Sequence, residues 1–194
     1  MNTSDGVGAR VVQTAGPVLI IGSGLLGASL GLALRAGGVR VYLEDASPTS
    51  LHLASDVGAG QAFGDVLTEA GVRPRECGSD TPSYQAPSIV VVATPPDVAD
   101  RVIVESLLRF PDAIVTDVAS VKDAVVADVL RGLEREGRLE EASRYVGSHP
   151  MAGRERSGAG AADADLFYGR PWVIVAHEST WPRAVLVARA LATD

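Results

Sequence analysis

The stretch from Val18 to Ser29, VLIIGSGLLGAS, constrains the fold more than any other part of the chain. Four apolar residues lead into Gly22, Gly24 and Gly27, spaced as in G-x-G-x-x-G, and a helical pattern follows. The first glycine permits a sharp turn, the second leaves room for a pyrophosphate against the backbone, and the third lets the helix pack closely on the strand. The helix N-terminus would then face the phosphates. The pattern predicts a strand, turn and helix that bind a dinucleotide through Gly22, Ser23, Gly24, Leu25, Leu26 and Gly27.

A carboxylate at the expected distance supports this interpretation. A glycine motif alone is weak, because such turns also occur for packing reasons. A second apolar segment, residues 39–44, leads directly into Asp45, which lies 18 residues after Gly27. A carboxylate there would accept hydrogen bonds from ribose hydroxyls and repel a 2′-phosphate, and no arginine directly follows it. The sequence therefore predicts NAD rather than NADP as the cofactor.

Composition excludes several classes of function. The chain has 194 residues, 46% of them hydrophobic, which suits one compact domain or one domain and part of another. A formal net charge of −7 argues against nucleic acid or an anionic membrane as the main partner. Cys77 is the only cysteine beside three histidines, so no internal disulfide and no metal site are expected. We expect a cytoplasmic protein.

The uncharged run between Arg10 and Arg35 is long enough to resemble a membrane-spanning helix. Five glycines and Pro17 interrupt it, and a spanning helix would not tolerate so many breaks. A cleaved signal would begin with a basic region, whereas Asp5 offsets the charge of Arg10. We therefore expect neither a membrane span nor a signal peptide.

Apolar segments alternate with helical patterns along the rest of the chain. We expect a mobile leader at residues 1–15 and a dinucleotide-binding domain at 16–194. No hairpin signal joins the strands, so the sequence predicts an α/β fold with a doubly wound, mostly parallel sheet of the Rossmann type. Residues 60–87 are less clear, with room for a short helix and a short third strand. The charged segment Glu134–Glu141 is interpreted as a solvated helix end or loop. The clear strands are expected at 18–21, 39–44, 89–93, 113–117 and 171–176.

Ligands in such a sheet bind where the strands end, so the residues just after each strand are the candidates for chemistry. His149 could take a proton near neutral pH, or it could be a surface residue of a loop. Ser120 could cap a helix or turn its hydroxyl to a ligand. Asp117 and Lys122 could form a structural pair, and Glu155 could be a surface charge or could cover the mouth of the pocket. Thr94 and Pro95 follow the central strand.

Four blocks of sequence resemble the nucleotide-binding domain of the prephenate dehydrogenase family. The two less specific blocks are the glycine turn and the strand end before Pro96. The more specific ones are TDVASVK, from Thr116, and GSHPMAGRERSG, from Gly147, and Gly169-Arg-Pro-Trp172 also fits. The resemblance covers about residues 17–190.

Members of this family oxidise the ring C4 alcohol of prephenate with NAD and release the ring carboxylate, giving 4-hydroxyphenylpyruvate, CO2 and NADH. The resemblance implies that His149 accepts the hydroxyl proton and that Ser120 hydrogen-bonds near the hydroxyl and the nicotinamide. It also implies that Glu155 helps to control entry. Asp117 is a further candidate at the cofactor, and Lys122 is a candidate for gripping one end of the substrate. Arg154 and Arg156 are further candidates for that grip.

The chain departs from the family in two respects. The connection from Ser120 to His149 is long, and we expect the chain to lack the C-terminal helical domain that forms the family's dimer. A homodimer is therefore expected only where that domain is present, and the activity of the isolated chain stays open. Arogenate as substrate and a non-catalytic NAD-binding module are the alternatives.

Overall fold

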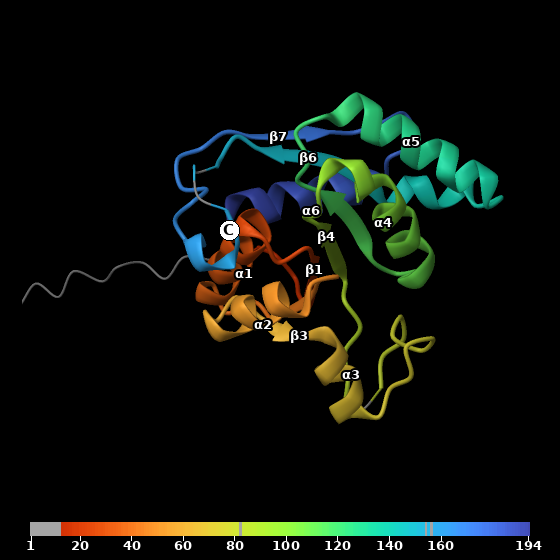
Figure 1. Cartoon of the computed structure of the whole chain (residues 1–194). Helices are drawn as coiled ribbons and strands as arrows, with labels where there is room; N and C mark the ends of the chain where they lie inside the picture. Colours follow the sequence, from red (N-terminus) through yellow and green to blue (C-terminus); the bar gives the residue numbers. More distant parts are fainter. Residues whose placement is uncertain (1–12, 82, 154, 156) are drawn as a thin grey trace, which may run out of the picture.

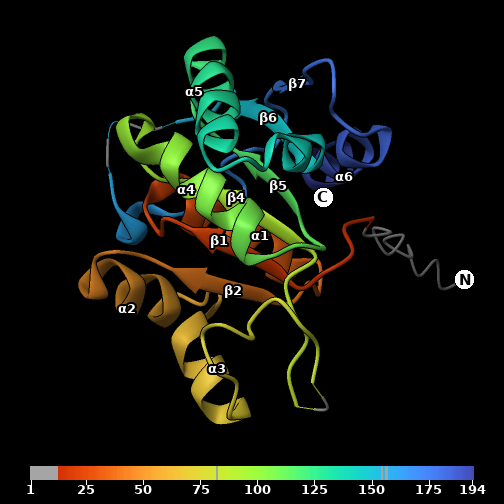
Figure 2. The ribbon, with the colours of Figure 1, turned by 90° about the vertical axis from the view of Figure 1, so that its right-hand side faces the viewer.

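A computed structural model describes residues 13–81, 83–153, 155 and 157–194. The described residues form a seven-stranded sheet in the order β3-β2-β1-β4-β5-β6-β7, with helices on both faces (Figures 1 and 2). The strands are β1 (Val18–Ile21), β2 (Val41–Glu44), β3 (Gln61–Ala62), β4 (Ile89–Val92), β5 (Ile114–Asp117), β6 (Tyr145–Pro150) and β7 (Trp172–Val175). The helices are α1 (Leu25–Ala36), α2 (Pro48–Asp56), α3 (Phe63–Ala70), α4 (Pro96–Arg109), α5 (Lys122–Arg135) and α6 (Pro182–Thr193), with 3-10 turns η1 (Leu139–Arg144) and η2 (Ala159–Ala161).

The sheet is parallel from β3 to β6, which confirms the predicted doubly wound α/β fold. β7 departs from this pattern, because it pairs antiparallel with β6. Pro150 lies opposite Trp172, so the connection between the two strands begins and ends at the same end of the sheet. The described residues of this connection form η2 and no crossover helix, and the returning strand therefore runs in the opposite direction.

Apolar side chains alternate between the two faces of the sheet. Leu19, Val90 and Val115 point to the face covered by α3, α4, α5 and η1. Ile20 and Val91 point to the other face, where they pack against α1 and α2. Every residue of β4 is buried, as expected for a central strand covered on both sides.

The structure confirms some local predictions and changes others. Residues 60–87 hold the short strand β3 and the helix α3, both of which were expected there. His149 lies within β6, not in a loop after it. Val121 is the N-cap of α5 and no side chain caps that helix, so the interpretation of Ser120 as the N-cap is wrong. The charged segment is not fully solvated either, because the Glu141 side chain is only 14% exposed and pairs with the buried Arg144.

The beginning of the described chain is anchored to its end. The backbone amides of Gln13 and Thr14 donate to Oδ2 of Asp194, at 2.8 and 2.6 Å. These two residues, expected in the mobile leader, are thus fixed, whereas residues 1–12 of that leader lie outside the described residues. Within the described chain, none of the helices combines the length and the apolar character that crossing a membrane requires.

Candidate cofactor and catalytic site

A cleft of about 780 Å³ opens at the carboxyl ends of β1, β2 and β4. The glycine turn forms one wall of the cleft, and the conformation of this turn depends on two of its glycines. Gly22 has φ +100°, and a Cβ on it would lie 2.6 Å from the backbone of Ala93 after β4. Gly27 lies so close to the turn that a Cβ would fall 1.9 Å from the Gly22 carbonyl oxygen. Only glycine fits at both positions, which supports the turn and close packing predicted for them.

Two observations indicate that this cleft can hold a dinucleotide. Gly24 lines the cleft, and no atom lies within 4 Å of the place that its Cβ would fill, so the backbone is open to an approaching phosphate. Helix α1 begins there without a side-chain cap and without an acidic residue in its first turn, which leaves its N-terminus available to an anion. Opposite it, the buried Oγ1 of Thr94 has no hydrogen-bond partner among the described residues.

Asp45 lies in the same cleft, directly after β2. Its Oδ2 accepts hydrogen bonds from the amide and the hydroxyl of Ser23, and its Oδ1 accepts one from the amide of Ser47. The carboxylate therefore joins the glycine turn to the start of α2. Each carboxylate oxygen can accept two hydrogen bonds, so capacity remains for a ribose hydroxyl.

Arg109, the last residue of α4, also lines the cleft, and no sequence pattern predicted its presence there. Its Nη1 donates to both carboxylate oxygens of Glu44, each at 2.9 Å. Although no arginine directly follows Asp45 in the sequence, Arg109 thus places a cation in the same cleft. The separation of 65 residues between Glu44 and Arg109 explains why no local signal could join them.

The predicted cofactor residues divide into two groups. The cleft is lined by Gly22, Gly24, Leu25, Leu26, Asp45, Thr94 and Pro95. Ser23, Gly27 and Asp117 are buried and stand outside this lining. Ser23 and Gly27 support the glycine turn through their contacts with Asp45 and Gly22.

Asp117 centres a buried polar cluster between β5 and β6. Its carboxylate pairs with Lys122 and accepts hydrogen bonds from the Tyr145 hydroxyl at 2.9 Å and the Ala119 amide at 3.0 Å. Its backbone carbonyl accepts from the Ser148 hydroxyl at 2.7 Å. Burial lowers the pKa of Lys122, and the charge of Asp117 opposes this shift. Burial, together with the neighbouring Asp117, raises the pKa of Tyr145.

This cluster fixes the segments that carry His149 and Ser120. Ser148 bonds to β5 and directly precedes His149, whose buried Nδ1 has no hydrogen-bond partner among the described residues. Ser120 is exposed and stands between Asp117 and Lys122, and its hydroxyl takes no part in capping α5. Among the described residues, Nδ1 of His149 and the hydroxyl of Ser120 thus remain available for a ligand, near the ends of the neighbouring strands β6 and β5. Tyr145 and Ser148 were not predicted, because their sequence context is that of ordinary strand residues.

Glu155 is exposed on the connection that follows β6. Arg154 and Arg156, the candidates for gripping substrate, lie outside the described residues. A search of the described part of the chain finds no group of three or more His, Cys, Asp and Glu residues placed to hold a metal ion.

Comparison with known proteins agrees with this geometry. Residues 30–193 match the family profile of the prephenate dehydrogenase nucleotide-binding domain. The "Probable prephenate dehydrogenase NovF" of Streptomyces niveus is 38% identical over 157 residues, which cover 81% of this chain and 37% of that protein.

Solved structures show the same relationship. Prephenate dehydrogenase from A. aeolicus, in complex with hydroxyphenyl propionate and NAD+, superposes with a TM-score of 0.71 at 25% identity, covering 91% of this chain and 56% of that one. Synechocystis arogenate dehydrogenase gives a TM-score of 0.69 at 25% identity, covering 90% and 55%. The chain therefore spans less than two thirds of the length of each of these relatives.

Proposed function

The chain belongs to the prephenate dehydrogenase family, and from this premise we propose that it provides the NAD-binding and proton-accepting part of an enzyme that oxidises prephenate. The observation that carries the proposal is the uncommitted Nδ1 of His149, held at the end of β6 in a domain built to bind a nucleotide. The reaction is the oxidative decarboxylation that yields 4-hydroxyphenylpyruvate, a step of tyrosine biosynthesis.

The residues of the cleft fit NAD. The open backbone at Gly24 and the uncapped start of α1 would hold the pyrophosphate, and Asp45 would accept the ribose hydroxyls. Thr94 and Pro95, after β4, would line the path from the phosphates towards the nicotinamide. When bound, NAD supplies the acceptor for the hydride that leaves the substrate.

The protein's own contribution to the reaction is control of a proton. His149 would accept the proton of the C4 hydroxyl as the hydride leaves, which requires an imidazole that is neutral and within hydrogen-bond reach. Ser120 would donate to, or accept from, the same hydroxyl and keep it oriented. The buried pair of Asp117 and Lys122 would hold both segments in place from below, while Glu155 would guard the entrance.

Arogenate is the second candidate substrate, because the Synechocystis arogenate dehydrogenase superposes almost as closely as the prephenate enzyme. The two substrates undergo the same chemistry at the ring, and the residues described above act on the ring. They do not distinguish the two side chains.

The test is to measure NAD binding to the 194-residue chain by calorimetry and NADH formation with prephenate and with arogenate. We expect NAD to bind, and the oxidation to be slow unless further protein closes the substrate side of the site. A chain that binds no NAD would contradict the proposal. So would a longer natural protein containing this chain that oxidises neither substrate.

A further inference from the structure

The far end of the cleft contains a salt bridge that the proposed reaction does not use. Glu44 is the last residue of β2, and Arg109 is the last residue of α4. Nη1 of Arg109 donates to both carboxylate oxygens of Glu44, each at 2.9 Å. The side chains are 36% and 23% exposed, so both reach the cleft surface while much of each is covered. Among the described residues that line the cleft, Arg109 is the only cation.

Arg109 is held rigidly by more than its ion pair. Its Nε donates to the Sγ of buried Cys77 at 3.3 Å, and its Cζ lies 5.3 Å from the ring centroid of Phe63 and 5.0 Å from that of Phe110. Cation–π contacts of this length stabilise a partly desolvated guanidinium. Burial alone would lower the pKa of Arg109, but the hydrogen bonds to Glu44 and Cys77 raise it above its ordinary value. The cation is therefore permanent and has little freedom to move.

The position of the pair indicates which part of a dinucleotide it would face. Glu44 is followed directly by Asp45, the residue assigned to the ribose hydroxyls, and both line the cleft. NADP differs from NAD by a phosphate on this ribose. A free arginine at this end of the cleft is the usual receptor for that phosphate, because its fork-shaped donors match phosphate oxygens.

We propose that Glu44 is a specificity-determining residue that keeps NADP out by occupying Arg109. The inference rests on the proposed binding of NAD in this cleft. In the folded chain Nη1 of Arg109 donates to the Glu44 carboxylate and Nε donates to Cys77. A 2′-phosphate therefore meets two acidic residues and a cation whose charge is already paired. Without the Glu44 carboxylate, the same cation becomes a receptor for the phosphate.

The test compares dissociation constants for NADP and NAD by calorimetry on the full 194-residue chain. In Glu44→Gln, the ratio of the NADP constant to the NAD constant should fall by about tenfold, the effect expected of one charge-assisted hydrogen-bonded contact. The gain should shrink at high salt, because it depends on a partly exposed charge. Arg109→Gln, alone or combined with Glu44→Gln, should show no such gain.

Glu105→Gln is the matched control. Glu105 is exposed and lines the same cleft, and its side chain makes no hydrogen bond or ion pair in the part of the chain that the structure describes. Its substitution removes the same charge without releasing Arg109, so the ratio should change by less than about twofold.

The outcomes separate this inference from the proposed function. If the wild-type chain binds no NAD, the proposed function fails, and this inference fails with it. If NAD binds and Glu44→Gln leaves the ratio unchanged, only the inference is wrong. A gain that persists in Glu44→Gln/Arg109→Gln, or that Glu105→Gln reproduces, would also overturn it, because Arg109 would then not be the receptor.

Discussion

Oδ2 of Asp45 accepts two hydrogen bonds from Ser23, one from its amide at 2.6 Å and one from its hydroxyl at 2.8 Å. Ser23 is fully buried and lies between the first two glycines of the turn. The carboxylate thus has a structural role that the sequence motif does not reveal. It orders the loop that would carry the pyrophosphate, in addition to the contact with ribose that we propose.

The two roles of Asp45 can be separated by comparing Asp45→Asn with Ser23→Ala. Ser23→Ala removes one hydrogen bond and should lower the free energy of unfolding by about 1 kcal/mol, with a small effect on NAD affinity. Asp45→Asn also removes the charged acceptor and should weaken NAD binding by about tenfold or more. Urea unfolding and calorimetric titration measure the two effects. Equal losses of affinity in both variants would mean that Asp45 acts only through the turn.

Much of this site follows from local sequence, and the remainder depends on packing. Asp45 could be located because it directly follows the second strand of a compact unit whose dimensions vary little. Arg109 could not, since its approach to Glu44 depends on the length of α4 and on the order of β2 and β4 in the sheet. The direction of β7 was equally hidden, because an irregular connection carries no signal for strand direction. A buried arginine such as Arg144 has the sequence appearance of a surface residue.

Substitution of His149 tests the assignment of the proton acceptor. In an active enzyme containing this domain, His149→Asn should lower kcat by about 10² to 10⁴, the range for loss of a general base, while NAD affinity changes little. His52→Asn is the control, since the His52 side chain is 82% exposed on α2 and should affect neither quantity. Steady-state kinetics and NAD titration give the two readouts. Unchanged kcat in His149→Asn would exclude the role.

The pair of Asp117 and Lys122 should contribute strongly to stability. The Asp117 side chain is fully buried and that of Lys122 is 10% exposed, so Lys122→Met leaves a buried carboxylate without its cation. Loss of one partner of such a pair lowers the free energy of unfolding by about 3 to 5 kcal/mol. In Asp117→Asn/Lys122→Met the loss should be much smaller than the sum of the single losses, because no charge remains buried. Additive losses in urea unfolding would show that the two residues act independently.

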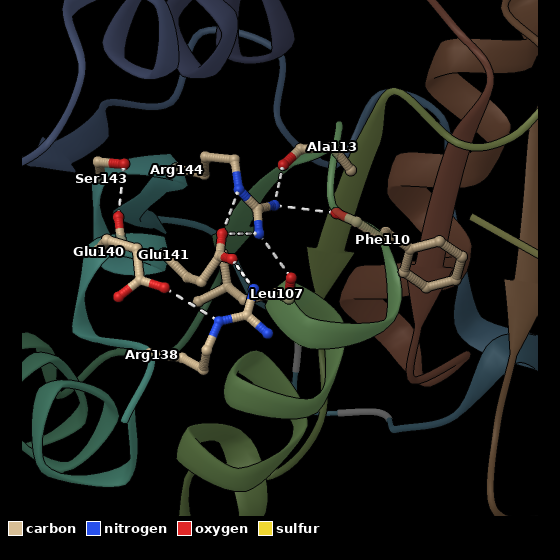
Figure 3. A network of polar contacts seen from close by, with 8 residues as sticks. All are labelled: Leu107, Phe110, Ala113, Arg138, Glu140, Glu141, Ser143 and Arg144. Atoms are coloured by element: carbon tan, nitrogen blue, oxygen red, sulfur yellow. Dashed lines mark hydrogen bonds and ion pairs between the residues drawn. The ribbon is translucent and has the colours of Figure 1, made fainter. Parts of the chain in front are cut away.

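A second buried network, formed by Arg144 and Glu141, should make the stability of the fold depend on pH in the acid range. The guanidinium of Arg144 donates to the carbonyl oxygens of Leu107, Phe110 and Ala113, at 2.6, 2.9 and 2.8 Å (Figure 3). The first two carbonyls stand at the C-terminal end of α4, where helical acceptors have no partner within the helix. The cation is balanced by Glu141, whose Oε2 accepts from Arg144 at 2.5 and 3.0 Å. Arg144 thus joins η1 to the end of α4 and the start of β5.

Glu141 should therefore stabilise the fold only while it is ionised. Burial would raise its pKa, but hydrogen bonds from Arg144 and Arg138 lower it below the ordinary value of 4.5. A carboxyl with a depressed pKa in the folded state contributes stability above its unfolded pKa, and that contribution is lost as the pH falls through the folded pKa.

At pH 7, the free energy of unfolding of Glu141→Gln should be about 2 kcal/mol lower than that of the wild type. This difference should disappear as the pH falls well below 4.5. Glu140→Gln is the matched control. The Glu140 side chain is 67% exposed and, among the described residues, pairs only with Arg138, so its effect should stay below about 0.5 kcal/mol at every pH. The measurement is urea unfolding of the wild type and the two variants across this pH range. If the difference in free energy of unfolding between Glu141→Gln and the wild type stays constant down to acid pH, the charge of the carboxylate contributes nothing to the network.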